Sequence, residues 1–216
     1  MMELKSEYLL DLNHTMVGEL LAGEYPWEIL GDLSDLIRAI GRQLSRDDYT
    51  ELSPDLWVAK NVRVSPGASL TAPLIVCAGT EIRHGAYLRG SALIGEGCVI
   101  GNSTEIKNAI LFDGVKVPHF NYIGDSILGY RVHLGAGAVL SNVRCDGAKV
   151  IVRSDPPITT ARRKLGAILG DGCEVGCHAV INPGTVLGRG STVYPLTSVS
   201  GVYPDGSRVR GNARGS

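Results

Sequence analysis

Two cations in the middle of the chain have the spacing that a binding site for an anion needs. Arg89 and Lys107 are 18 residues apart, and each directly follows an aliphatic residue of a repeated pattern. If that pattern closes one turn every 18 residues, the two side chains lie one above the other. Stacked cations without neighbouring acids repel each other, so we expect an anion between them, and a phosphate suits a guanidinium. Two solvated surface cations are the simpler alternative.

A histidine follows a short distance downstream. His119 lies in the segment Pro118-His119-Phe120-Asn121-Tyr122. Histidine can accept a proton near neutral pH without a large pKa shift, so His119 is a candidate general base. A packed or hydrogen-bonded imidazole is the alternative, because geometry and not residue type defines a base.

A period of six residues positions these side chains. It begins with nine aliphatic residues at steps of six: Val58, Val64, Leu70, Val76, Ile82, Leu88, Ile94, Ile100 and Ile106. The register slips by one residue at Leu111 and again at Leu128, and it resumes at Leu169 after an insertion. Neither a helix nor an alternating strand has a period of six. Three hexapeptides make one turn of a triangular coil, so the sequence predicts an all-β solenoid, a parallel β-helix with inward aliphatics.

The repeat also divides the chain. Residues 1–50 lack it, and the apolar spacing from Pro26 to Leu44 predicts a short helical N-terminal cap over the open edge of the first coil. We expect residues 51–205 to form the β-helix, with an inserted loop or hairpin at 141–168, and residues 206–216 to form a C-terminal tail. In a solenoid such an insertion projects from one face, which is often the functional one.

Composition excludes several classes of protein. The 216 residues carry a net charge of −1 without a long run of one sign, which argues against a nucleic-acid partner or a membrane partner. No apolar stretch is long enough for a signal peptide or a membrane span, so we expect a cytoplasmic protein. The five cysteines are an odd number and are predicted to be reduced core thiols.

From Arg89 to Asp146 the sequence resembles a known family, the acetyltransferase domain of the bacterial bifunctional glucosamine-1-phosphate acetyltransferase and N-acetylglucosamine-1-phosphate uridyltransferase. The resemblance is carried by Leu88-Arg89, Glu105-Ile106-Lys107, His119 with Tyr122-Ile123-Gly124-Asp125, and Ser141-Asn142. The later run Arg162-Arg163-Lys164 resembles archaeal sugar-1-phosphate nucleotidylyltransferases with a C-terminal amino-sugar acetyltransferase. The resemblance implies a left-handed winding, a homotrimer with sites shared between subunits, and acetyl-CoA as co-substrate with no metal.

The resemblance also implies roles for individual residues. Arg89 and Lys107 would bind the sugar phosphate, and His119 would be the general base. The remaining roles are orientation of the base by Glu105, substrate contact by Tyr122 and by His133, placement of the amine or acetyl group by Asn142, and a coenzyme contact by Cys177. Three positions depart from the family: His133 replaces an asparagine, Val143 a tyrosine and Pro118 a glycine.

These features predict acetyl transfer from acetyl-CoA to the amine of glucosamine or galactosamine 1-phosphate. Residues 1–57 contain no glycine-rich nucleotide loop, so no pyrophosphorylase activity is expected. A non-catalytic sugar-phosphate sensor or scaffold of the same fold is one alternative. A zinc enzyme like the γ-class carbonic anhydrases is another, although the four solenoid histidines, His84, His119, His133 and His178, lack the close pair expected there.

Overall fold

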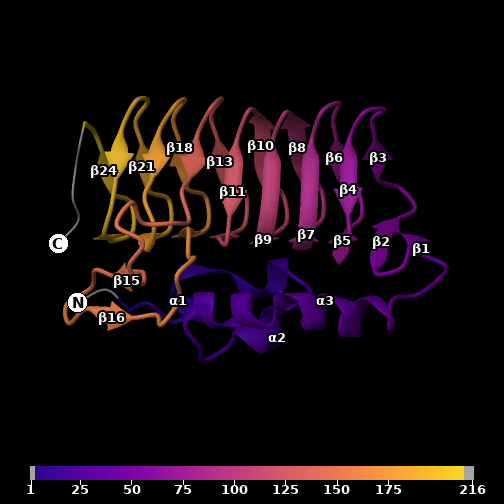
Figure 1. Cartoon of the computed structure of the whole chain (residues 1–216), viewed down its shortest axis with the longest axis horizontal. Coiled ribbons are helices and arrows are strands. Elements are labelled where there is room, and N and C mark those ends of the chain that lie inside the picture. Colours follow the sequence, from indigo (N-terminus) through magenta and orange to yellow (C-terminus); the bar gives the residue numbers. More distant parts are fainter. Residues whose placement is uncertain (1–2, 212–216) are drawn as a thin grey trace.

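A computed structural model describes residues 3–211, and most of them form a left-handed parallel β-helix (Figure 1). The predicted fold class is confirmed. The coil has three faces, which we number in the order in which each turn visits them. Face 1 is an eight-stranded parallel sheet of β3 (Arg63–Val64), β6 (Glu81–Ile82), β8 (Val99–Asn102), β10 (Lys116–His119), β13 (His133–Leu134), β18 (Glu174–Val175), β21 (Thr192–Val193) and β24 (Arg208–Val209).

The other two faces are joined into one larger sheet, because β7 (Tyr87–Ile94) and β9 (Glu105–Leu111) run round the corner between them. Face 2 holds the first halves of β7 and β9 together with β4 (Ser69–Thr71), β11 (Tyr122–Gly124), β14 (Val139–Leu140), β19 (Val180–Ile181) and β22 (Ser198–Val199). Face 3 holds their second halves together with β2 (Leu56–Ala59), β5 (Leu74–Val76), β12 (Ile127–Leu128), β17 (Ala167–Leu169), β20 (Thr185–Leu187) and β23 (Val202–Tyr203).

The inward aliphatics of the repeat fill the prism that the three faces enclose. Ile82, Leu88 and Ile94 have no exposed surface, and residues of all three faces belong to one apolar cluster. Two of the nine aliphatics behave differently: Val64 is 41% exposed and Leu70 is only partly buried. Both belong to the first coil, which has no preceding coil to cover it.

The two register slips fall at the corner between faces 2 and 3. Each slip removes one residue from the corner, and the residues that remain there, Asn108 and Asp125, have left-handed φ angles of 49° and 48°. Asparagine and aspartate enter this region more easily than most residues. The slips therefore place two polar side chains at the same corner of neighbouring coils.

The N-terminal segment lies along face 3, parallel to the long axis of the solenoid (Figure 1). It consists of α1 (Ser6–Leu9), η1 (Leu12–His14), α2 (Gly18–Leu21), η2 (Pro26–Gly31) and α3 (Leu33–Gly41). The cap was expected over the first coil. There, the open edge of face 3 is instead paired with β1 (Tyr49–Ser53), which runs antiparallel to β2.

Outward apolar residues explain this position. Leu93, Ile110 and Ile127 project from face 3 and are at most 1% exposed, because they pack against helical residues such as Trp27 and Ile37. Burial of this stripe removes apolar surface that would otherwise face water on every coil.

One glycine lets the helix approach the sheet. A Cβ on Gly41, at the end of α3, would lie 2.2 Å from the ring of Trp57. Only glycine leaves room for the indole at this point of contact between α3 and face 3.

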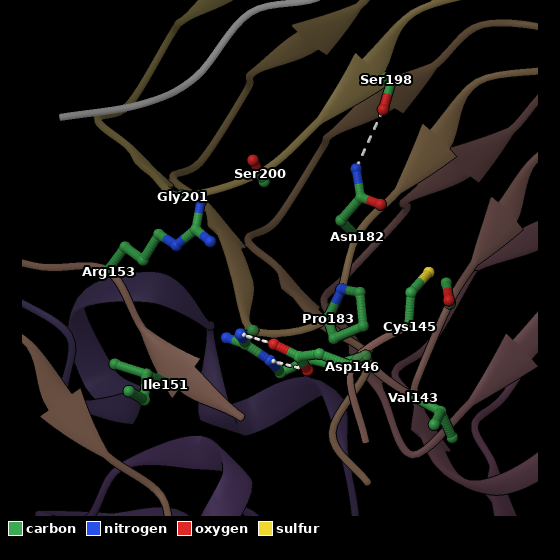
Figure 2. A pocket seen from close by; sticks show the side chains of 13 residues that line it. Val143, Cys145, Asp146, Ile151, Arg153, Asn182, Pro183, Ser198, Ser200 and Gly201 are labelled. Atoms are coloured by element: carbon green, nitrogen blue, oxygen red, sulfur yellow. Dashed lines mark hydrogen bonds and ion pairs between the residues drawn. The ribbon is translucent and has the colours of Figure 1, made fainter. Parts of the chain in front are cut away.

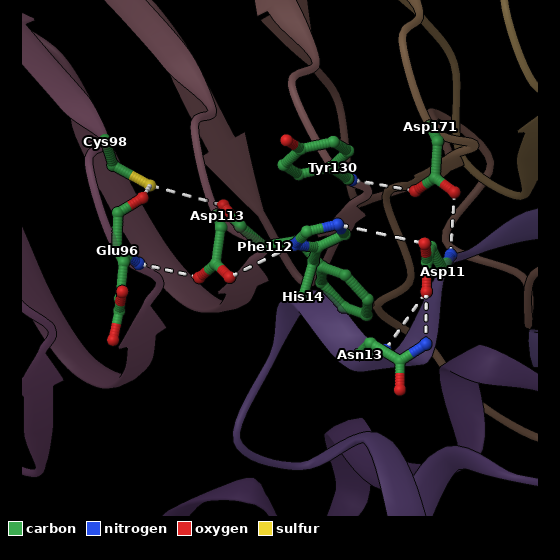
Figure 3. A network of polar contacts seen from close by, with 9 residues as sticks. All are labelled: Asp11, Asn13, His14, Glu96, Cys98, Phe112, Asp113, Tyr130 and Asp171. Atoms are coloured by element: carbon green, nitrogen blue, oxygen red, sulfur yellow. Dashed lines mark hydrogen bonds and ion pairs between the residues drawn. The ribbon is translucent and has the colours of Figure 1, made fainter.

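A polar network also fastens the N-terminal segment to the solenoid (Figure 3). The ring of His14 stacks on Tyr130 with 3.6 Å between ring centroids, and its Nδ1 lies 3.5 Å from the Asp113 carboxylate. Asp171 accepts hydrogen bonds from the backbone N–H groups of Asp11 and Tyr130. Burial raises the pKa of Asp171, although these two hydrogen bonds act in the opposite direction.

We call the insertion at 141–168 the excursion, because it leaves the coil. It contains a two-stranded antiparallel hairpin, β15 (Ile151–Val152) with β16 (Ile158–Thr159). Val150 and Val152 are buried with the residues between the N-terminal segment and face 3. The Arg162 guanidinium donates a hydrogen bond of 2.8 Å to the carbonyl of Glu28. The excursion is thus held by the N-terminal segment as well as by the coil.

Three other expectations can be compared with the structure: those on the C-terminal tail, the cysteines and a membrane span. β24 lies within the region 206–216 expected as a tail, and residues 212–216 of that region lie outside the described part. The cysteines are free, but only Cys77, Cys98 and Cys173 are buried; the expected core position is wrong for the exposed Cys145 and Cys177. Between residues 3 and 211 the helices are too short and too polar for any of them to cross a membrane.

Candidate functional site

The outer surface of face 2 brings most of the predicted site residues together. Arg89 and Lys107 are register partners on neighbouring coils, as their 18-residue spacing predicts. Glu105 and Tyr122 are register partners as well, two positions earlier along the strands of the same face. Because successive residues of a strand point to opposite sides, these four side chains project outward while Leu88 and Ile106 between them point into the prism.

The expectation that the two cations have no acidic neighbours is wrong. The Nε of Arg89 donates a hydrogen bond of 2.6 Å to Oε1 of Glu105, and Nζ of Lys107 lies 3.5 Å from Oδ2 of Asp125. The Glu105 carboxylate raises the pKa of Arg89. Glu105, which the resemblance places beside the base, is thus engaged by a cation, and an anionic ligand here would compete with two carboxylates.

Asp125 is the centre of this surface, although neither the spacing nor the resemblance assigned it a role. The side chain is buried, and its two oxygens accept hydrogen bonds from the amide groups of Asn108 and Asn142. Asn108 also donates to the carbonyl of Leu30 in the N-terminal segment. A buried carboxylate needs such partners to offset its desolvation, so Asp125 fixes Asn142 and Lys107 relative to the coil.

Tyr122 and Asn142 meet over a glycine. A Cβ on Gly124 would lie 2.6 Å from Nδ2 of Asn142 and 2.7 Å from the hydroxyl oxygen of Tyr122. Any other residue would therefore displace both side chains. Burial raises the pKa of Tyr122, and the nearby Glu105 and Asp125 carboxylates act in the same direction. The phenol thus stays protonated and can act as a hydrogen-bond donor toward a ligand on face 2.

His119 lies at the corner where face 1 passes into face 2. It ends β10, is paired in register with Asn102, and is exposed. Its backbone N–H donates to Oδ1 of Asn121, and within residues 3–211 its ring has no hydrogen-bond or ion-pair partner. An imidazole in this position is open to a ligand from both face 1 and face 2.

Two predicted residues lie apart from the face 2 group within one chain. His133 projects from face 1, where its Nδ1 lies 2.8 Å from Oε2 of Glu174. Cys177 is exposed at the same corner as His119 but two coils further on, with Ala136 between them in the backbone ladder. The described residues contain no group of three or more histidine, cysteine or acidic side chains that could hold a metal ion.

A cavity of about 570 Å³ opens where the excursion leaves the coil (Figure 2). Ser141, Asn182 and Ser200 form its solenoid wall, and they continue the column of face 2 positions to which Lys107 belongs. Arg144 and Arg153 line it from the excursion. The eight predicted site residues are not among its lining residues. Only the general rule that insertions carry function pointed to this region.

Comparisons with known proteins agree with the resemblance seen in the sequence. A family model described as the GMPPB C-terminal domain matches residues 70–162. The chain is 29% identical over 175 residues to the bifunctional protein GlmU of Methanococcus maripaludis strain C5, which covers 78% of this chain and 42% of that protein. It is 31% identical over 150 residues to the bifunctional sugar-1-phosphate nucleotidylyltransferase/acetyltransferase of Sulfurisphaera tokodaii, which covers 69% and 37%. The chain spans about two fifths of the length of these curated relatives.

Solved structures of acetyltransferases also match. The acetyltransferase domain of PglB from Neisseria gonorrhoeae has a TM-score of 0.34 and 15% identity, with 80% of this chain and 78% of that chain covered. PerB from Caulobacter crescentus, in complex with CoA and GDP-perosamine, has a TM-score of 0.29 and 17% identity, with 80% and 60% covered.

Proposed function

We propose that this chain is a CoA-dependent N-acetyltransferase that acts on the amine of an amino-sugar 1-phosphate, glucosamine or galactosamine 1-phosphate. The observation that carries the proposal is the arrangement of face 2, where a pair of stacked cations, a tyrosine and an amide lie beside an exposed histidine. The name of one curated relative, the bifunctional sugar-1-phosphate nucleotidylyltransferase/acetyltransferase of Sulfurisphaera tokodaii, supports the reaction class.

In this mechanism the sugar phosphate binds to Arg89 in place of the Glu105 carboxylate and accepts from Lys107, whose ammonium stays beside the buried Asp125. The amine then attacks the thioester carbonyl carbon of acetyl-CoA while His119 accepts its proton. The C–N bond forms, the C–S bond breaks, and the thiolate of CoA leaves and takes up a proton. Positioning by the phosphate supplies much of the rate, because it holds the amine at a fixed distance from the thioester. No covalent intermediate with the protein is needed.

A homotrimer is part of the proposal. The N-terminal segment covers face 3, whereas residues 3–211 of one chain place no such cover on the other two faces. Face 1 of a neighbouring copy would bring a second His133 toward face 2, which joins the two groups of predicted residues that a single chain keeps apart. We expect light scattering in solution to give three times the mass of 22.9 kDa.

A non-catalytic sugar-phosphate-binding or scaffold protein is the second candidate. The observation that favours it is the engagement of both cations by carboxylates, so that neither Arg89 nor Lys107 requires a phosphate for charge balance. Binding of glucosamine 1-phosphate without any turnover would be the result expected from this candidate.

The test is acetyl transfer from acetyl-CoA to glucosamine 1-phosphate and galactosamine 1-phosphate, with the N-acetylated product measured by mass spectrometry. A thiol reagent is less suitable because Cys145 and Cys177 are exposed and would react with it. His119→Ala should lower kcat by about 10²- to 10⁴-fold, as expected for loss of a general base. The matched control is His84→Ala, an exposed histidine two coils away at the same corner. Full turnover by His119→Ala, or no turnover of either sugar by the unmodified chain, would refute the mechanism.

A further inference from the structure

We propose that the cavity beneath the excursion is a second ligand site, which binds a nucleoside diphosphate group. We call it the excursion cavity; its walls are Ser141, Asn182 and Ser200 on the coil and Arg144, Ile151 and Arg153 on the excursion. This group has a base, a ribose and a second phosphate that a sugar 1-phosphate lacks. The inference therefore goes beyond the proposed acceptor site on Arg89 and Lys107.

The size and the place of the cavity fit a ligand of this class. Its volume of about 570 Å³ falls within the range typical of small-molecule sites. Ser141 lies two coils beyond Lys107 in the same column of outward positions, with Gly124 between them. A ligand in the excursion cavity would therefore lie beside the face 2 group and not on it.

Arg153 supplies the charge. In β15 and the residues around it, Val150 and Val152 turn toward the buried flank, so Ile151 and Arg153 turn to the cavity (Figure 2). Arg153 is exposed, and its guanidinium has no partner within the described part of the chain. A free guanidinium binds the oxygens of a phosphate through paired, charge-assisted hydrogen bonds.

The second guanidinium of the cavity is already neutralised. Arg144 donates from Nε to Oδ1 of Asp146 at 2.9 Å and from its terminal nitrogen to the other carboxylate oxygen. This pairing lowers the pKa of Asp146, so the pair persists at neutral pH. Arg153 is thus the cation that the cavity offers to a phosphate.

The remaining walls suit a nucleoside. The hydroxyl groups of Ser141 and Ser200 have no partner among residues 3–211. The amide nitrogen of Asn182 is occupied by Ser198 and by the Val199 carbonyl, which leaves the amide oxygen to accept from a ribose hydroxyl.

The apolar surface that a base needs is present as well. Val143 is 46% exposed and Ile151 is 38% exposed, and both line the cavity together with Pro183. Large apolar side chains left open beside free hydroxyls and a free guanidinium fit a ligand with an apolar ring at one end and phosphates at the other.

A nucleoside diphosphate group occurs in CoA and in nucleotide-linked sugars, and the experiment separates these sources. Binding of CoA, ADP and UDP to the full chain would be measured by titration calorimetry. Arg153→Gln should weaken binding of the ligand that occupies the cavity by about tenfold or more, because it removes a charge-assisted contact. Arg163→Gln is the matched control, since Arg163 is exposed on the same excursion but does not line the cavity; it should leave binding unchanged.

The pattern of losses identifies the source. Weaker binding of CoA and ADP with UDP unaffected assigns the cavity to the coenzyme, and a loss confined to UDP assigns it to a nucleotide-linked sugar. Ser200→Leu, which fills the cavity from the coil side without a change of charge, should abolish the same binding. Equal effects of Arg153→Gln and Arg163→Gln, or no binding of any of the three ligands at millimolar concentration, would overturn the inference. Because binding is measured directly, a failure of acetyl transfer does not affect this result.

Discussion

Faces 2 and 3 are built from the same hexapeptides but serve different purposes. On face 3 the residue before each inward aliphatic is also apolar, as in Leu93-Ile94, Ile110-Leu111 and Ile127-Leu128, and the N-terminal segment covers this stripe. On face 2 the equivalent outward positions are mixed: they hold Glu105 and Tyr122 but also Val139 and Val180, and no helix among residues 3–211 covers them. The inward residues therefore define the solenoid, and the outward residues decide whether a face is a packing surface or a binding surface.

This comparison predicts unequal costs for similar truncations. Ile110→Ala on face 3 should lower the free energy of unfolding by about 2–5 kcal/mol, because the isoleucine has no exposed surface and a cavity would remain. Val180→Ala on face 2 should change it by less than about 0.5 kcal/mol, because Val180 is 37% exposed. Urea denaturation of both variants measures the difference. Equal losses would mean that face 2 is as tightly packed as face 3.

Asp125 should be the costliest polar residue of face 2. Asp125→Asn removes the buried charge that the two asparagine amides and Lys107 share, and we expect a loss of about 1.5–3 kcal/mol of unfolding free energy. A double-mutant cycle with Asn142→Ala should show a coupling of about 0.5–3 kcal/mol, since the two side chains are in contact.

The control for this cycle is Asp113→Asn. Asp113 accepts a hydrogen bond from the backbone of Glu96 and lies near His14, on the flank that carries the N-terminal segment, and it shares no partner with Asn142. Its effect should add to that of Asn142→Ala. Additivity for Asp125 as well would show that it does not position Asn142.

The sequence predicted the coil well because its signal is local and repeated. Every inward aliphatic reports the same environment, and Val64 and Leu70 depart from it only because the first coil has no predecessor. The position of the N-terminal segment could also have been read, since the doubled aliphatics recur about once per turn on face 3. The apolar face of residues 26–44 shows that this segment packs against another apolar surface. It does not show which surface that is.

The site was harder to predict than the fold. The spacing of Arg89 and Lys107 predicts their stacking, yet it does not show that Glu105 reaches the arginine of the previous coil. Asp125 accepts hydrogen bonds from Asn108 and Asn142 at a corner with a left-handed backbone. In the sequence this corner is marked only by a register slip next to an Asn or Asp. The excursion cavity depends on the path of an irregular segment, which no periodicity describes.

The smallest expected effect concerns the thiols, which report whether face 3 stays covered. Burial raises the pKa of Cys77, beneath the N-terminal segment, and of Cys98, inside the prism, to about 12. At pH 8 about one in ten thousand of such thiols is ionised, so iodoacetamide should label the exposed Cys177 and leave both unmodified. Ile110→Ala should loosen the flank and speed labelling of Cys77 while Cys98 stays protected, as mass spectrometry of digests would measure. If Cys98 reacts together with Cys77, the flank opens only when the coil unfolds, and the two apolar layers form one cooperative unit.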